Sequence, residues 1–278
     1  MTRPIVIVGD TLLDCDVEGE ANRLSPDGPV LVLDERHVDE RPGGAGMAAV
    51  LAAAHGEEVV LITGLADDEP AGRLHAALTG ARVRVYPLRS TGTTPQKIRF
   101  RSDRRTLLRL DRGGYMSTTN LPDAALEALR HAAAVLVSDY GGGITAGSAL
   151  RRAIAGLSVP IVWDPHPRGA PAVAGTRLIT PNEAEVYRMT GDRPQGRRIT
   201  AVARAAHIMR DRWGAGSVAV TMGADGALLC DGSGIPTIIP SPGPAAVVSD
   251  ACGAGDQFAV AVTAALARGA LTAEAVAQ

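Results

Sequence analysis

Short apolar runs rich in β-branched residues alternate along the chain with alanine-rich segments of helical periodicity. We expect strands at residues 5–9, 59–63, 83–86, 135–138, 161–164, 178–180, 218–221 and 227–229. We expect helices at residues 44–54, 70–78, 122–133, 146–155, 183–189, 200–212 and 255–268. Several strands are apolar throughout, which is typical of a sheet covered on both faces. The alternation predicts an α/β fold with a mostly parallel sheet and ligands at the carboxyl ends of its strands.

Two other segments, residues 29–40 and 96–111, alternate polar and apolar side chains. This pattern is typical of antiparallel ribbons with one exposed face. We expect the ribbons to pair in a small second sheet, a lid made from about residues 14–41 and 92–112. Since the chain contains no repeat or long linker, we expect residues 1–278 to form one domain. The Pro- and Gly-rich residues 232–244 are expected to be a surface connection.

Composition narrows the function classes. The net charge of -2, without a basic tail or stripe, predicts no nucleic-acid partner. The three cysteines have no CxxC spacing, so we expect neither a zinc site nor a disulfide framework, but a reducing cytoplasm. The first apolar run ends at Gly9 and is too short for a signal peptide or a membrane span, so we expect no membrane partner.

The most informative motif is Gly253-Ala254-Gly255-Asp256, between an expected strand at residues 246–249 and an alanine-rich helix. Small residues at a helix N-terminus let backbone N–H groups approach an anion, which the helix dipole also favours. Such a segment could cradle a transferring phosphoryl group while Asp256 accepts a proton from the attacking hydroxyl. A tight turn followed by a helix-start charge would have the same local sequence.

Three further features have both a chemical and a structural interpretation. Gly43-Gly44 could present backbone groups to a polar ligand or serve packing alone, and it does not fit a GxGxxG dinucleotide motif. Asp14 could accept hydrogen bonds from sugar hydroxyls, or cap a helix or face solvent. Asn182 and Glu185 could orient hydrated Mg²⁺ on one helix face, but a capping box alone explains them and is favoured locally.

In this order the motifs resemble the ribokinase (PfkB) family of carbohydrate kinases over nearly the whole chain. The residues at 253–256 match its GAGD signature, and Gly43-Gly44 match its second signature. Within the family the likeness is strongest to the heptose 7-phosphate kinases, the kinase half of a bifunctional heptose enzyme. The less generic matches are Arg-Pro-Gly-Gly-Ala at 41–45 and Ser-Asp-Tyr at 138–140.

The resemblance implies a ribokinase-like three-layer α/β/α fold with a small β lid. It also implies an ATP- and Mg²⁺-dependent kinase that phosphorylates D-glycero-β-D-manno-heptose 7-phosphate at O1, giving the 1,7-bisphosphate. The alternatives are a family kinase for a hexose phosphate or free sugar, and a non-catalytic sugar- or nucleotide-binding relative. As in relatives, a homodimer formed through the lid is expected.

The resemblance also implies roles for individual residues. Asp256 is the catalytic base, and the amides of Gly253, Ala254 and Gly255 hold the phosphoryl charge. Residues implied to contact the sugar substrate are Asp14, Gly43, Gly44, Lys97, Arg99 and Asp139. Residues implied to lie along the nucleotide are Asn182, Glu185, Thr221, Gly223 and Gly226, the first two also positioning Mg²⁺ through water. Lys97, the only lysine in an arginine-rich chain, and Arg99 are implied to grip the substrate's existing phosphate.

The chain departs from the family pattern at several positions. Met47 replaces an asparagine that contacts sugar hydroxyls, and Gln257 replaces a threonine or serine after the GAGD motif. His166, with Arg168 nearby, stands where the heptose kinases have lysine after Asp-Pro. The sequence stops at Gln278, soon after the expected catalytic helix, so we expect a shortened carboxyl-terminal end and weak ATP binding.

Overall fold

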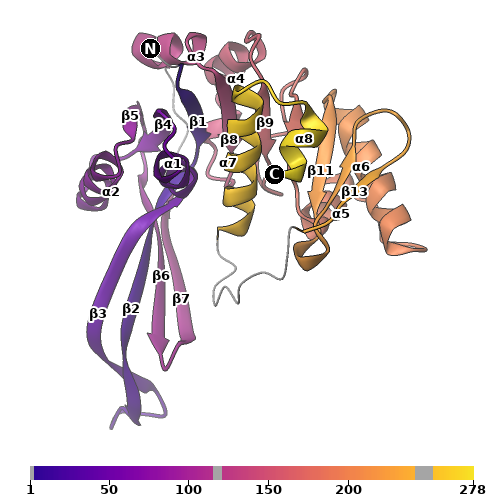
Figure 1. Cartoon of the computed structure of the whole chain (residues 1–278). Coiled ribbons are helices and arrows are strands. Elements are labelled where there is room, and N and C mark those ends of the chain that lie inside the picture. The colour runs from indigo at the N-terminus through magenta and orange to yellow at the C-terminus, as the bar shows by residue number, and fades with distance from the viewer. Residues whose placement is uncertain (1–2, 115–120, 242–252) are drawn as a thin grey trace.

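The computed structural model describes residues 3–114, 121–241 and 253–278. Within these ranges, nine strands form a central sheet in the order β13-β12-β11-β10-β9-β8-β1-β4-β5 (Figure 1), with antiparallel pairing only between β12 and its neighbours β11 and β13. Its strands are β1 (Ile5–Gly9), β4 (Val59–Leu65), β5 (Arg84–Arg89), β8 (Ala134–Ser138), β9 (Ile161–Asp164), β10 (Leu178–Ile179), β11 (Ser217–Thr221), β12 (Ala227–Cys230) and β13 (Thr237–Ile239). The predicted mostly parallel α/β sheet is confirmed.

Helices cover both faces of this sheet. The helices of one face are α1 (Ala45–Ala54), α2 (Glu69–Gly80), α7 (Ala254–Ala267) and α8 (Thr272–Ala277). Those of the other are α3 (Asp123–Arg130), α4 (Ser148–Ala155), α5 (Glu183–Thr190) and α6 (Arg198–Trp213). Successive side chains of β1 enter opposite apolar clusters, because side chains alternate across a strand. This double burial explains why β1 is apolar throughout.

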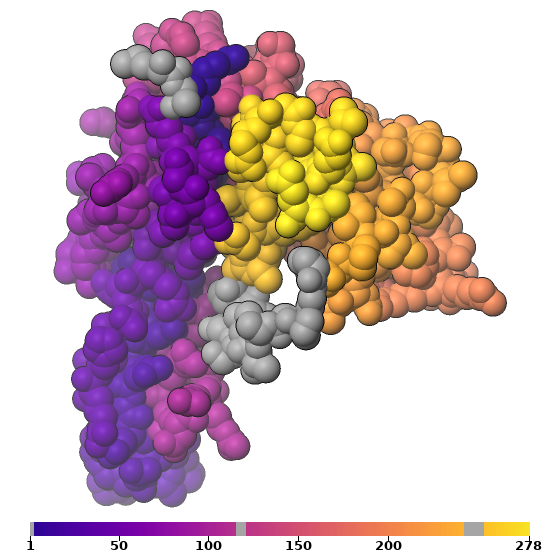
Figure 2. Space-filling view, viewed as in Figure 1, coloured from indigo at the N-terminus to yellow at the C-terminus, as the bar shows by residue number. Residues whose placement is uncertain are grey.

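A second sheet of four strands projects from the main body (Figures 1 and 2). Its strands, in the order β3-β2-β6-β7, are β3 (Leu31–Gly44), β2 (Thr11–Leu24), β6 (Thr93–Ser102) and β7 (Arg105–Gly114). β2 follows β1 after Asp10 and pairs antiparallel with β3 and parallel with β6. The expected small second sheet is therefore confirmed, and we call it the small sheet.

Several sequence-based expectations need correction. The two ribbons do not pair directly, because β2 lies between them. The stretch expected to be only a surface connection contains β13, and the helix expected from residue 146 begins at Ser148 after a 3-10 turn, Ile144–Ala146. The strand expected at residues 246–249 lies outside the described residues. In the part of the chain that is described, no helix is both long and apolar enough to cross a membrane.

Candidate active site

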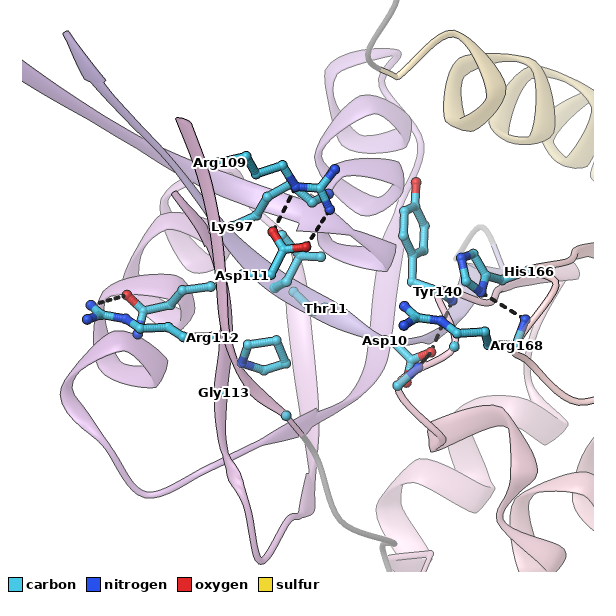
Figure 3. Close-up of a pocket in the computed structure, with 16 residues that line it drawn as sticks. Asp10, Thr11, Lys97, Arg109, Asp111, Arg112, Gly113, Tyr140, His166 and Arg168 are labelled. Carbon is cyan, nitrogen blue, oxygen red and sulfur yellow. Dashed lines mark hydrogen bonds and ion pairs between the residues drawn. The ribbon is translucent and has the colours of Figure 1, made fainter. Parts of the chain in front are cut away.

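The candidate site lies where the small sheet meets the carboxyl ends of β1, β8 and β9. A cavity of about 400 Å³ opens there. Figure 3 shows Lys97, Arg109 and Asp111 on the small sheet facing Tyr140 and His166 across this cavity. We call it the sugar-side cavity. A second cavity of about 480 Å³ is lined by residues near η2 (Gly223–Asp225), by the first turns of α7 and by the end of α8, and we call it the nucleotide-side cavity.

Asp256 lies in the first turn of α7, where Gly253 at the N-cap has a left-handed φ of 97°. Its side chain accepts hydrogen bonds from the Tyr140 hydroxyl at 2.9 Å (Oδ1) and 2.8 Å (Oδ2). Burial raises the pKa of Asp256 to about 6, while the Tyr140 hydrogen bond and the charge of Lys97 oppose the rise and Asp14 adds to it. The carboxylate is therefore anionic at neutral pH yet basic enough to accept a proton.

Asp10 organises the loop that carries Tyr140. It is 3% exposed. Its Oδ2 accepts hydrogen bonds from the backbone N–H groups of Tyr140 and Gly142, and its Oδ1 accepts one from Ile144. Because backbone donors hold both oxygens, the carboxylate of Asp10 shapes the crevice wall.

Gly43 and Gly44 allow the backbone at this wall to pack closely against β2 and Asp10. Gly44 has a φ of 61°, and a Cβ there would lie 2.3 Å from the carbonyl oxygen of Asp10. A Cβ on Gly43 would lie 2.5 Å from Oδ2 of Asp14. Both positions therefore require glycine, which lets β3 turn directly into α1. The structure brings Asp14, Gly43 and Gly44 together at this corner.

Asp139 is expected to bind substrate, but its carboxylate is hydrogen-bonded to groups of the protein itself. Its carboxylate accepts hydrogen bonds from the Gly141 N–H at 2.7 Å, the Thr145 hydroxyl at 2.6 Å and the Ala170 N–H at 3.2 Å. Burial is the main cause of its raised pKa. These contacts suit a residue that fixes the loops after β8 and β9.

Charged side chains share the face of the small sheet that borders the sugar-side cavity. Lys97 is in register with Asp14 on β2 and with Asp111 on β7, and it lines the cavity. Arg99 instead pairs with two carboxylates: its Nη1 atom lies 3.0 Å from Oδ1 of Asp14 and 3.3 Å from Oδ1 of Asp16. The expected pair is thus divided: Lys97 borders the cavity, whereas Arg99 orients Asp14.

Sequence reasoning gave no role to four other residues that line this cavity: Arg109, Arg112, Tyr140 and Arg168. Arg109 forms a two-pronged ion pair with Asp111, with N–O distances of 2.7 and 2.6 Å. Residues 109 and 111 are two positions apart on a strand, and this spacing is the sequence signal that places both side chains on one face of the sheet. With Lys97, these arginines give the cavity a strongly basic border.

The expected nucleotide residues fall into two groups. Thr221, Gly223 and Gly226 line the nucleotide-side cavity together with Gly255. Asn182 and Glu185 form a reciprocal capping box at the start of α5, with N–O distances of 2.8 and 2.9 Å, which confirms the capping box that their spacing indicates. A bridge between Asn182 and Thr221 nevertheless places this helix start beside the strand that leads to the cavity.

Several carboxyl groups lie near one another in this part of the molecule: Asp139, Asp164, Glu185 and Asp256. Burial raises the pKa of Asp164 well above its usual range, and the nearby carboxylates of Asp256, Glu185 and Asp139 raise it further. Burial also raises the pKa of Glu185. Within the described residues, no three His, Cys, Asp or Glu side chains are grouped closely enough to hold a metal ion directly.

Comparison with known proteins identifies the class to which this fold and site belong. The profile of the pfkB family of carbohydrate kinases matches residues 2–278. The chain therefore belongs to the pfkB family and is a carbohydrate kinase.

Solved structures that share its fold include Arabidopsis thaliana ribokinase complexed with ribose and ATP, with a TM-score of 0.75 and 22% identity over 99% of this chain and 89% of that one. Phosphofructokinase-2 from Escherichia coli, in a tetrameric inhibited form, has a TM-score of 0.71 and 19% identity over 98% of this chain and 90% of that one.

The curated relatives are more similar in sequence. The bifunctional protein HldE of Streptomyces coelicolor is 48% identical over 275 residues, which are 98% of this chain and 58% of the relative. HldE of Pseudomonas fluorescens (strain Pf-5) is 34% identical over 270 residues, 96% of this chain and 56% of the relative. The chain thus spans less than two thirds of the length of these relatives.

Proposed function

We propose that this carbohydrate kinase transfers the γ-phosphoryl group of ATP to O1 of D-glycero-β-D-manno-heptose 7-phosphate. The observation that carries the proposal is the place of Asp256. It begins the helix that borders the nucleotide-side cavity, and its Tyr140 partner lines the basic sugar-side cavity. The 48% identity to HldE of Streptomyces coelicolor supports the heptose substrate.

In this mechanism Asp256 removes the proton from the sugar's O1 hydroxyl. The resulting oxygen attacks the γ-phosphorus, the bond from that phosphorus to the β–γ bridging oxygen breaks, and ADP leaves with the electron pair. The N-terminus of α7 at Gly253, Ala254 and Gly255 stabilises the charge on the transferring group through its backbone N–H groups and helix dipole. Positioning and charge stabilisation supply most of the catalysis in such reactions.

The 7-phosphate of the substrate would bind at the basic border of the sugar-side cavity. Lys97 is the ammonium on this border, and a compact ammonium suits a phosphate. Arg112 and Arg168 add guanidinium groups on two sides of the same cavity. Asp14, fixed by Arg99 at 3.0 Å, would accept hydrogen bonds from sugar hydroxyls near Gly43 and Gly44.

Mg²⁺ fits the start of α5. The capping box keeps one amide and one carboxylate side by side there, and the neighbouring Asp164 adds a carboxyl group, so the oxygen atoms that Mg²⁺ prefers are at hand. Mg²⁺ usually keeps several of its waters, so a site with few direct ligands suits it. Asn182 and Glu185 would hold the hydrated ion, and the bound ion would neutralise charge on the β- and γ-phosphates.

We also propose that two chains associate through the small sheet. On its apolar face, Leu108 and Leu110 are in register with Phe100 and Ile98. Leu108 is 59% exposed and Leu110 is 41% exposed, so this face leaves apolar surface for the same face of a second chain.

The two described cysteines, Cys15 and Cys230, are both free thiols, which supports a reducing cytoplasmic location.

A substrate panel tests the proposed function. The purified protein is incubated with ATP and Mg²⁺ and with heptose 7-phosphate, several hexose phosphates or free sugars, and ADP release is measured with Asp256→Asn as the control. We expect kcat/KM to be highest for the heptose 7-phosphate. Preference for a hexose phosphate or free sugar would identify a different family kinase. Sugar or nucleotide binding without turnover of any substrate would indicate a non-catalytic relative.

A further inference from the structure

Tyr140 directs its hydroxyl at the candidate catalytic base. The Oη atom lies 2.9 Å from Oδ1 and 2.8 Å from Oδ2 of Asp256. A tyrosine hydroxyl has one proton, so this nearly symmetric arrangement shares a single donor between both carboxylate oxygens. Tyr140 also lines the sugar-side cavity, which places this contact at the edge of the space that the sugar would occupy.

The backbone around Tyr140 holds the ring in this position. The Tyr140 N–H donates to Asp10 at 3.0 Å, and the next residue, Gly141, donates to Asp139 at 2.7 Å. Asp10 is buried and also accepts from Gly142, so the loop is anchored on both sides of the ring. Two buried carboxylates therefore fix the loop whose side chain reaches the base.

We propose that Tyr140 is a positioning residue that holds the Asp256 carboxylate in place and favours its anionic form until the sugar hydroxyl arrives. The proposal rests on the role of Asp256 as the base in the proposed function. Because the tyrosine proton is shared, the sugar hydroxyl can take one carboxylate oxygen while Tyr140 keeps the other. The base is then already oriented at the moment of proton transfer.

Other charged groups also face Asp256, from each element packed against it. Lys97 on β6 lowers its pKa, Asp14 on β2 raises it, and Asp164 at the end of β9 is a further carboxyl whose own pKa is raised by Asp256. Tyr140 differs from these groups because its hydroxyl lies within hydrogen-bond distance of both carboxylate oxygens of Asp256. Removing its hydroxyl removes a donor to the anion, so Asp256 should bind its proton more tightly.

Tyr140→Phe tests the proposal through the pH dependence of kcat/KM for heptose 7-phosphate. A hydrogen bond to a charged group corresponds to about one to two pH units, so the acid limb should move up by that amount. At pH 6 the variant should be about tenfold or more slower than wild type, and above the shifted limb the two should agree within about threefold. Tyr86→Phe, far from the site on β5, is the matched control and should leave the limb unchanged.

A second variant reverses the expected sign. Placing 3-fluorotyrosine at position 140 strengthens the hydroxyl as a donor, so the acid limb should move down. A merely structural role for Tyr140 would lower kcat/KM equally at all pH values and would leave both limbs in place. An unchanged limb in Tyr140→Phe and in the fluorinated protein would overturn the proposal.

A measurement without substrate separates this inference from the proposed function. The carboxyl carbons of the aspartates are labelled with ¹³C, and the Asp256 signal is assigned by its loss in Asp256→Asn. Its titration midpoint should rise in Tyr140→Phe by about one to two pH units. That rise in a protein that phosphorylates no sugar would refute the proposed function while supporting the Tyr140–Asp256 coupling. An unshifted midpoint in an active enzyme would refute the coupling alone.

Discussion

The burial of Asp256 predicts that this carboxylate, the proposed catalytic base, destabilises the folded protein. Its side chain is 6% exposed, and its pKa is raised from 3.8 to about 6 in the folded state. Between these two pH values the folded state binds more protons than the unfolded state, so stability falls as the pH rises through this window. Above pH 6 the full penalty is present, and below about pH 4 none of it remains.

The size of the penalty follows from the pKa shift. A shift of about two units at about 1.36 kcal/mol per unit corresponds to ~3 kcal/mol. Asp256→Asn keeps the shape of the side chain and an acceptor for the Tyr140 hydroxyl but carries no charge. The variant should therefore unfold with a free energy up to ~3 kcal/mol higher than wild type at pH 8, and with no such gain at pH 4.

Urea unfolding followed by circular dichroism measures this difference at a series of pH values. Asp67→Asn, an exposed carboxylate near the start of α2, is the control and should change stability by less than about 0.5 kcal/mol. Equal stabilities of Asp256→Asn and wild type at pH 8 would refute the reasoning. A gain that persists unchanged at pH 4 would also contradict it, because the effect would then not arise from ionisation.

Three further predictions concern the substrate, the crevice wall and assembly. Lys97→Met should raise KM for the sugar phosphate about 10- to 100-fold with little change in kcat at pH 8, and equal KM values would refute its phosphate role. Gly44→Ala should lower the free energy of unfolding in urea by about 1–3 kcal/mol, because φ at this position is 61°. Gly72→Ala in α2, where a Cβ would meet open space, is the control and should not lower it. Equal effects of the two substitutions would contradict the claim that backbone strain at residue 44 requires glycine. Light scattering at micromolar concentration should show a wild-type dimer and a Leu108→Asp monomer, and a monomeric wild type would count against the interface.

Much of the fold could be predicted because its signals are local. Four consecutive apolar side chains in β1 are buried on both faces of the sheet, so their pattern alone predicts a central strand. The small sheet was harder, because β2 continues from β1 and carries Asp14 and Asp16 on one face. From the sequence, Asp14 could contact a sugar, cap a helix or face solvent, but arginines from β3 and β6 pair with both carboxylates. Such pairing between distant segments leaves no local signal.

The candidate site could likewise be predicted only where its signals are local. The glycine pair and the Gly-Ala-Gly-Asp motif could be recognised because their function depends on adjacent residues. Tyr140 could not be assigned a role, since its partner Asp256 is 116 residues away in sequence. An isolated helix as short as α8, which has six residues, would be marginal. Tertiary contacts hold it: Val276 is buried, and Thr272 accepts a 2.9 Å hydrogen bond from Arg177.

The most direct test of the central claim is the kcat of Asp256→Asn with ATP, Mg²⁺ and D-glycero-β-D-manno-heptose 7-phosphate, with ³¹P NMR identifying the product as the 1,7-bisphosphate. Loss of a positioned general base typically lowers the rate ~10²- to 10⁴-fold, and sugar binding measured by calorimetry should be nearly unchanged. Wild-type production of the 1,7-bisphosphate, with a loss of that size in the variant, is the predicted result. A variant that retains more than about a tenth of the wild-type kcat would contradict the assignment of Asp256 as the base.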